Sequence, residues 1–215
     1  MLELNWSLHG AFRRPWIWVA LVLLVAGGVW VSRTGLGGGD DQIARMAQSK
    51  DVEGLAQVAA SGSELDSCRA VKALANVRTP LALQVLRQRA QDDRAPVRGS
   101  SMIALARAGG RKEMTPAAAM LSQDKSAEAR ADAAKALGEA WDCDHVPDLI
   151  AALEDPEPVV TRQVQKSLAR ICGIEPGQTS SDPAVQRERL IKYYKAFWKL
   201  SGPVITRYHY EHRGK

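Results

Sequence analysis

The sequence predicts an all-α protein: a right-handed α-solenoid of about four helical hairpins, preceded by one transmembrane helix and closed by a C-terminal capping helix. The first observation is a template of small and apolar positions. Counted from Asp124, offsets 5, 9, 12, 13 and 16 form one stripe on a helix. The template recurs from Ser61, Asp92 and Asp155, so the origins are 31, 32 and 31 residues apart. A fixed period of this length is typical of a solenoid.

The second observation is an uninterrupted apolar run near the N-terminus. Residues 1–14 are followed by residues 15–32, which we predict to form a transmembrane helix because a run of this length can just cross a bilayer core. Tryptophans lie at both ends of the run, as in an interfacial aromatic belt: Trp16, Trp18 and Trp30. Two alternatives are a signal peptide cleaved near residues 26–28 and a buried helix of a soluble protein.

A glycine-rich linker, residues 33–40, separates this run from the solenoid, which we place at residues 41–175. Two short amphipathic stretches open the solenoid. The first carries Ile43, Met46 and Ala47, and the second covers residues 51–60. We expect them to form the first half of the first repeat and a helix in front of it.

Each later repeat pairs the template helix with a second apolar stretch. These stretches are residues 79–90, 116–121 and 146–153, and each has a proline near its start, where a helix tolerates a missing N–H. The Asp or Ser at or near the start of each template helix can cap it. The first repeat fits loosely, because Asp66 stands where an apolar residue is expected.

The repeat pattern stops after Ile171, and residues 176–215 form a separate C-terminal segment. Residues 173–181 have loop composition, and Ser181-Asp182-Pro183 is a strong helix start. We expect the helix to run to about Leu200 and to end at Gly202-Pro203. It is interpreted as a cap on the last repeat. The alternative is an aromatic, basic helix that contacts lipid headgroups or a partner.

The repeats resemble a known family. Residues 155–160 (DPEPVV), Val97-Arg98, Ala129-Arg130 and residues 134–138 (AKALG) are similar to HEAT repeats, an armadillo-like helical fold. They look most like the short bacterial kind, which is related to the repeats of phycobilin lyases, and the resemblance covers roughly residues 50–175. It implies a scaffold that binds a protein or peptide partner. It also implies that Arg98 and Arg130 connect adjacent repeats.

The charge distribution argues against nucleic acid as a partner. The formal charge of +5 lies in residues 176–215, with eight Lys+Arg against three Asp+Glu, whereas residues 61–175 carry sixteen of each. The template helices carry a sparse ladder of cations, which is either a solvated face or a shallow groove for an acidic peptide or phosphate. We expect the concave face to bind the partner through these side chains: Arg69, Lys72, Arg107, Lys135, Arg162 and Lys166.

The three cysteines lack the close spacing of a metal or redox motif. Cys68 lies inside a template helix and is expected to be buried. Cys143 and Cys172 lie at the two ends of an antiparallel hairpin that meet in space, so they are a possible disulfide if the domain lies outside the cytoplasm. The alternative is two unrelated thiols.

No catalytic, metal-binding or cofactor-binding pattern is found in the sequence. The hydroxylases built on HEAT repeats use His-Glu pairs, and this chain has none. His145 is expected at a helix start on the surface, and His209 and His212 lack further ligands nearby. We therefore predict no enzyme, no cofactor and no small-molecule substrate. A phycobilin-lyase-like enzyme or enzyme accessory remains the alternative.

Arg13 and Arg14 precede the apolar run and only Arg33 follows it closely, which favours a cytoplasmic N-terminus. The sequence thus predicts a single-pass protein of the bacterial inner membrane whose solenoid is periplasmic and holds an envelope protein or peptide. A tethered cytoplasmic adaptor, with its basic tail on anionic lipid, is the reversed arrangement.

Overall fold

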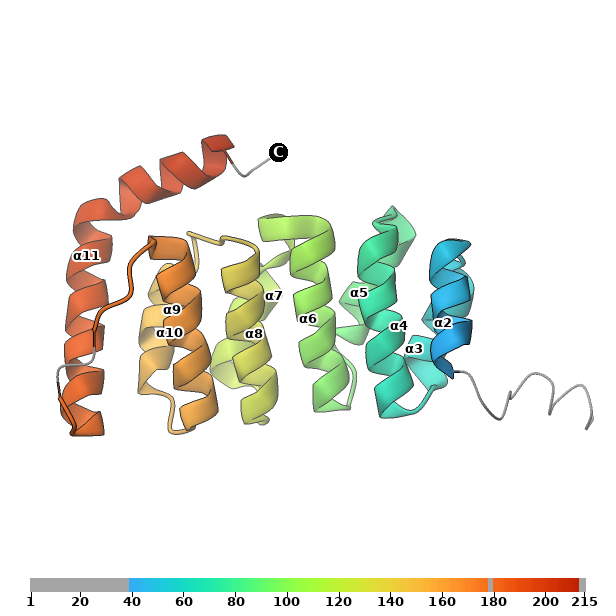
Figure 1. Cartoon of the computed structure of the whole chain (residues 1–215), viewed down its shortest axis with the longest axis horizontal. Coiled ribbons are helices and arrows are strands. Elements are labelled where there is room, and N and C mark those ends of the chain that lie inside the picture. Colours follow the sequence, from blue (N-terminus) through green and yellow to red (C-terminus); the bar gives the residue numbers. More distant parts are fainter. Residues whose placement is uncertain (1–38, 178–179, 213–215) are drawn as a thin grey trace, which may run out of the picture. The chain divides into compact units, whose positions relative to one another are not determined.

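The computed structural model describes residues 39–177 and 180–212, and this part of the chain consists of helices joined by short turns (Figure 1). The chain divides into a unit of residues 1–41, of which only 39–41 are described, and a compact unit of residues 42–215. The helices are α2 (Gly39–Gln48), α3 (Val52–Ser61), α4 (Glu64–Val77), α5 (Pro80–Arg89), α6 (Ala95–Gly109), η2 (Gly110–Glu113), α7 (Thr115–Gln123), α8 (Ala127–Glu139), α9 (Val146–Ala151), η3 (Ala152–Glu154), α10 (Pro158–Cys172) and α11 (Pro183–His212).

The predicted repeat is confirmed. The four template helices are α4, α6, α8 and α10, and the residue at offset 13 of each is buried to within 1% of full burial: Leu74, Leu105, Leu137 and Leu168. Each is the second helix of a hairpin whose first helix is α3, α5, α7 or α9. The second helices pack on one another in chain order, α4 on α6, α6 on α8 and α8 on α10. The hairpins therefore share one continuous core rather than having one each.

The first helices form a less regular layer. Helix α3 packs on α5, and α7 packs on α9. A groove of about 630 Å³ lies between α5 and α7, with α6 as its floor.

Serines cap two of the four second helices, α4 and α8, whereas the residues that precede α6 and α10 make no side-chain cap hydrogen bond. The hydroxyls of Ser63 and Ser126 accept hydrogen bonds from the amides of Asp66 and Ala129. The Asp66 carboxylate in turn accepts from the Ser63 hydroxyl at 2.7 Å, which explains its place in the first repeat. The expected Asp or Ser cap is therefore confirmed for these two helices, and the Asp124 carboxylate accepts instead from the amide of Ser126, within the turn.

The aspartate of one turn binds an arginine of the preceding repeat. Arg98 donates two hydrogen bonds to the Asp124 carboxylate, both at 2.8 Å, and Arg130 does the same to Asp155 at 2.7 and 3.0 Å. The remaining nitrogen of each guanidinium donates to backbone carbonyls of the arginine's own turn. The expectation that these arginines link adjacent repeats is confirmed.

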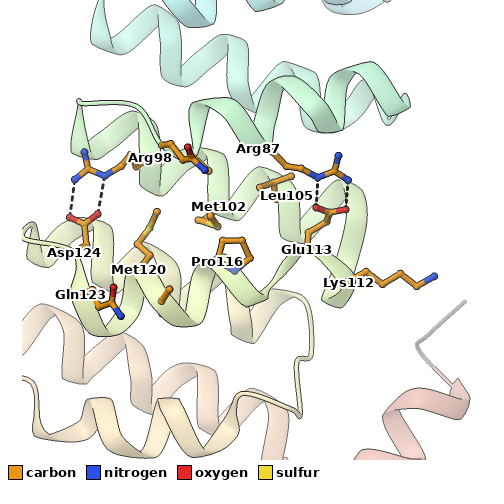
Figure 2. A pocket seen from close by; sticks show the side chains of 13 residues that line it. Arg87, Arg98, Met102, Leu105, Lys112, Glu113, Pro116, Met120, Gln123 and Asp124 are labelled. Carbon is orange, nitrogen blue, oxygen red and sulfur yellow. Dashed lines mark hydrogen bonds and ion pairs between the residues drawn. The ribbon is translucent and has the colours of Figure 1, made fainter.

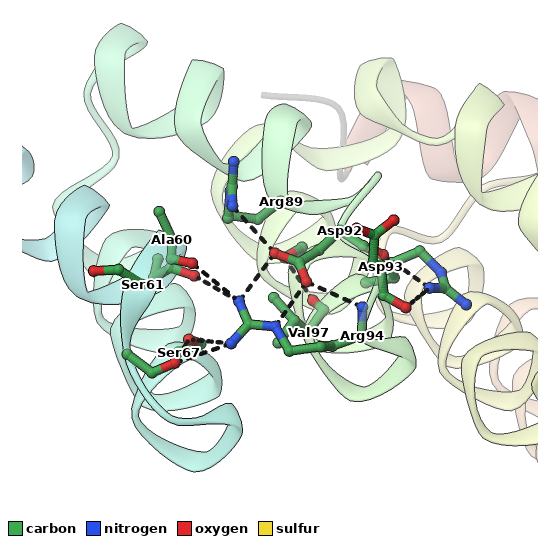
Figure 3. Close-up of polar contacts among 12 residues, drawn as sticks. Ala60, Ser61, Ser67, Arg89, Asp92, Asp93, Arg94 and Val97 are labelled. Carbon is green, nitrogen blue, oxygen red and sulfur yellow. Dashed lines mark hydrogen bonds and ion pairs between the residues drawn. The ribbon is translucent and has the colours of Figure 1, made fainter.

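The first junction has no arginine at that offset, because Ser67 occupies it. Figure 3 shows that Arg94, on the other side of the junction, makes the linking contacts instead. Its guanidinium donates to the Asp92 carboxylate, to the Ser67 hydroxyl and to the carbonyls of Ala59, Ala60 and Gly62, at 2.8–3.3 Å. At each of the three junctions, the guanidinium of one arginine thus bonds both to the turn of one repeat and to an aspartate in the turn of the next repeat.

Helix α11 covers the last repeat as expected, since Leu190 and Tyr194 are buried against the core. Its predicted end at Leu200 is wrong. The helix continues to His212 with Pro203 in its interior, and Figure 1 shows that it bends partway along its length. Beyond the bend His209 bonds to the Ile171 carbonyl at 2.9 Å, a contact that fixes the C-terminal part on the ends of the repeat helices.

The predictions for residues 15–32 lie outside the described residues, as do Trp16, Trp18 and Trp30. Among the helices that are described, none combines the length and the apolar character needed to cross a bilayer.

Candidate functional site

A hollow of about 370 Å³ opens on the face formed by the second helices. Three consecutive repeats contribute to it, because its polar lining comes from α4, α6 and α8. These side chains are Lys72, Ser100, Arg107, Asp132 and Lys135. We call it the second-helix hollow.

Asp132 lines this hollow and packs directly against Gly99 of α6. A methyl group at Gly99 would collide with the Asp132 carboxylate, so the glycine is what lets this carboxylate enter the α6–α8 contact. Burial raises the pKa of Asp132, and the nearby ammonium groups of Lys135 and Lys72 act in the opposite direction. The carboxylate therefore lies between two cations without a hydrogen-bonded ion pair to either.

The cations of the hollow differ in how far they are already neutralised. Arg107 donates to both oxygens of Glu139, at 2.7 and 3.1 Å. Lys72 and Lys135 form no ion pair with any residue that the structure describes. The two ammonium groups are therefore available to an incoming anion, while Arg107 mainly joins α6 to α8.

The hollow brings together three of the six predicted partner-binding residues: Lys72, Arg107 and Lys135. Arg69 lies outside it and contacts Asp66 at 3.4 Å. Arg162 and Lys166 are exposed on α10, also outside it, and Arg162 donates to the Pro158 carbonyl.

Sequence reasoning missed Ser100 and Asp132. A signal was present, because Asp132 lies three residues before Lys135 and therefore on the same face of α8. The contribution of Gly99 to the site could not be read from the sequence, since it depends on how closely α6 and α8 approach.

A second, larger groove of about 630 Å³ lies between α5 and α7. Figure 2 shows an ion pair at each end of it. These are Arg98 with Asp124, and Arg87 with Glu113 at 2.7 and 2.6 Å. Both pairs hold the pKa of their carboxyl group below its usual range. The groove between them is lined by apolar side chains, including Met102, Leu105, Pro116 and Met120.

Cys143 and Cys172 are both buried as free thiols. Burial raises the pKa of Cys143 to about 11 and that of Cys172 to about 12, and the charge of Cys143 adds to the second shift, so the two thiols are neighbours. A bridge between them stays a prediction. Cys68 is only partly buried, although it packs against the core.

The histidines of the described residues are held by structural contacts. His145 bonds to Asp142 at 2.9 Å. The His212 ring bonds to the backbone carbonyl of Tyr208 and also stacks on the Tyr208 ring. In the ranges 39–177 and 180–212 no group of three or more His, Cys, Asp or Glu side chains could hold a metal ion.

Comparison with known proteins agrees with this architecture. A family profile described as HEAT repeats matches residues 114–187, which include α7 to α10 and the start of α11. No curated protein matches the chain closely enough to count as a relative.

Proposed function

We propose that this protein is a HEAT-repeat scaffold that binds an acidic protein segment through its second-helix hollow and takes no part in catalysis. The observation that carries this proposal is the meeting of Lys72 and Lys135, from repeats far apart in the sequence, around one hollow. HEAT repeats commonly serve as protein-interaction surfaces, which supports the general class of function.

The chemistry of the hollow favours an extended acidic segment over a folded anionic surface. Two ammonium groups can receive carboxylates, and Asp132 and Ser100 can accept hydrogen bonds from backbone amides between them. The exposed cations Arg162 and Lys166 lie on the next second helix, α10, and could extend the contact. Many weak contacts along a solenoid face would add up to useful affinity.

The proposal includes a membrane anchor. The apolar run at residues 15–32 would hold the scaffold in the bacterial inner membrane, and the glycine-rich linker would let it reach its partner. The arginines before the run favour a periplasmic solenoid.

Photocrosslinking in cells tests the binding surface. A photoreactive amino acid at Ser100, inside the hollow, should give a discrete crosslinked partner. The combined charge reversal Lys72→Glu and Lys135→Glu should remove that crosslink without changing the helical content of the protein.

The matched control places the same photoreactive residue at Gln123, in the groove between α5 and α7. A partner that crosslinks from Gln123 and not from Ser100, and that survives the charge reversal, would move the interface to the groove. A partner that does not bind through an acidic segment would also contradict the proposal.

Labelling from outside the cell tests the location. A single cysteine placed after Gly39, with the native cysteines changed to serine, should react with a membrane-impermeant reagent in intact spheroplasts. Protection until lysis would reverse the arrangement and favour the tethered cytoplasmic adaptor.

A further inference from the structure

A third pocket, of about 380 Å³, lies where the second helices α4, α6 and α8 end, and the C-terminal part of α11 supplies one of its walls. We call it the helix-end pocket. Its side chains include Arg78, Arg111, Trp141, His209 and Tyr210. None of the functions considered above uses it.

Buried polar atoms without partners gather at this pocket. Within the described part of the chain, two buried side-chain nitrogens, Nη1 of Arg111 and Nδ1 of His209, have no hydrogen-bond partner, and both residues line the helix-end pocket. The buried hydroxyl of Tyr210 has the Asp144 carboxylate beside it. Because an unsatisfied buried polar group is costly, two of them around one space indicate that a polar ligand completes the site.

The arrangement holds these groups in place without satisfying them. The Arg111 guanidinium lies over the Tyr210 ring, 3.5 Å from its centroid. The His209 ring packs against Trp141 and uses Nε2 to donate to the Ile171 carbonyl, so that Nδ1 remains for another partner.

Backbone conformation gives a second, independent observation. Each second helix is followed by a residue with positive φ, and after α6 and α10 these are Gly110 and Gly173. After α4 and α8 the corresponding residues are Arg78 and Trp141, both at φ +53. A side chain is unfavourable in this conformation, and both of these residues line the helix-end pocket, whereas Lys50, a further described non-glycine residue with positive φ, follows α2 and lies outside it.

The charge of the pocket defines the ligand class. Arg78 and Lys112 line it and make no ion pair with the described residues, whereas Arg107 is neutralised by Glu139. Burial, a hydrogen bond to Asp144 and the charges of Asp144 and Asp142 raise the pKa of Tyr210. Arg78, Arg111 and Lys112 therefore face the space against two nearby carboxylates, of which Asp142 is already bonded to His145.

We propose that the helix-end pocket binds a small soluble anion that carries a phosphate group. Arg78 follows α4, whereas Arg111 and Lys112 lie on η2, so the cations come from two segments and would donate to different oxygens, which suits a tetrahedral group better than a planar carboxylate. A phosphate group with a small body attached fits the volume.

Titration calorimetry with inorganic pyrophosphate, on the full chain in a non-ionic detergent at constant ionic strength, tests this proposal. We expect saturable binding that Arg111→Met and Arg78→Gly each weaken by about tenfold, the effect of one charge-assisted hydrogen bond. The matched control Lys125→Gln, which removes an exposed cation in front of the start of α8, should leave the dissociation constant unchanged within twofold.

Arg78→Gly also separates this proposal from a purely structural role, in which the cations only complement the carbonyl ends of the helices. Arg78 is exposed, and glycine suits its positive φ, so this variant should melt no lower than the wild type. No binding by the wild type, as when water alone fills the pocket, would overturn the proposal. Equal weakening by Lys125→Gln would overturn it as well.

Discussion

One guanidinium group at each junction connects a turn of the solenoid to an aspartate of the next repeat. Arg98 and Asp124 are largely buried, with side-chain exposures of 19% and 9%, and their fork geometry fixes the register of α6 against the following turn. The pair matters for stability chiefly because removal of either partner would leave the other as a largely buried, unpaired charge.

A double-mutant cycle on this pair should reveal a coupling free energy of about 2 kcal/mol at pH 7. The variants are Arg98→Ala, Asp124→Ala and the double variant, and the measurement is urea-induced unfolding. The hydrogen bond from Arg98 holds the pKa of Asp124 below its ordinary value. The folded state therefore binds fewer protons than the unfolded state, and the coupling should shrink as the pH falls below about 4.

The exposed pair of Lys192 and Glu188 is the control. Glu188→Gln should have no measurable effect on unfolding at either pH. Equal coupling at pH 7 and at pH 3 would contradict the assigned ion pair.

For single residues, the sequence predicts which positions link the repeats better than it predicts which groups the side chains at those positions contact. The offset shared by Arg98 and Arg130 indicated a link between repeats, and the contacts confirm it. The substitution of Arg94 for the missing arginine at position 67 could not be predicted, because it reaches backwards across the junction from a different offset. The orphaned atom of Arg111 likewise depends on α11, which approaches it from a distant part of the chain.

At the scale of elements, the apolar stripe was sufficient to place every hairpin helix. The prediction from the sequence fails at the end of α11, because Gly202-Pro203 has the composition of a helix stop. Proline removes one hydrogen bond and bends a helix, yet tertiary contacts can hold the helix together beyond it. Here those contacts are made by His209 and Tyr210, and no local pattern reports them.

Removal of residues 201–215 should expose Cys143 selectively. Cys143 is 2% exposed and lies near the Thr206 hydroxyl, beyond the bend of α11, whereas Cys172 lies near Tyr194, before it. Burial raises the pKa of Cys143 to about 11, so exposure should also restore an ordinary, more reactive thiol. In a Cys68→Ser background, Cys143 should react with a thiol reagent at pH 8 about tenfold faster than in the longer chain.

Cys172 serves as the internal control and should stay slow. Equal acceleration of both thiols would mean that the whole of α11 depends on its C-terminal part. An unchanged Cys143 would mean that the bent part of α11 does not cover it.

At the scale of the whole molecule, stability is expected to be a sum of repeat and interface contributions. Helix α8 packs on both α6 and α10, and α10 gains α11 as a further neighbour, whereas α3 belongs to the first hairpin. Local opening should therefore begin at the N-terminal end, in α2 and α3, where the fewest interfaces must be broken.

Hydrogen exchange should show this gradient as slow amides in α6 and α8, intermediate ones in α10 and fast ones in α3. The C-terminal end owes its protection to the cap, whose anchor Tyr194 is 1% exposed and bonds to the Ile174 carbonyl. Tyr194→Ala should cost about 3 kcal/mol, because it removes a buried aromatic side chain. If interfaces add locally, the variant will accelerate exchange in α10 towards the rate of α3 and leave α3 itself unchanged. Equal acceleration in α3 and α10 would instead mean that residues 42–215 open as one cooperative unit, and removal of one repeat would then unfold all the others.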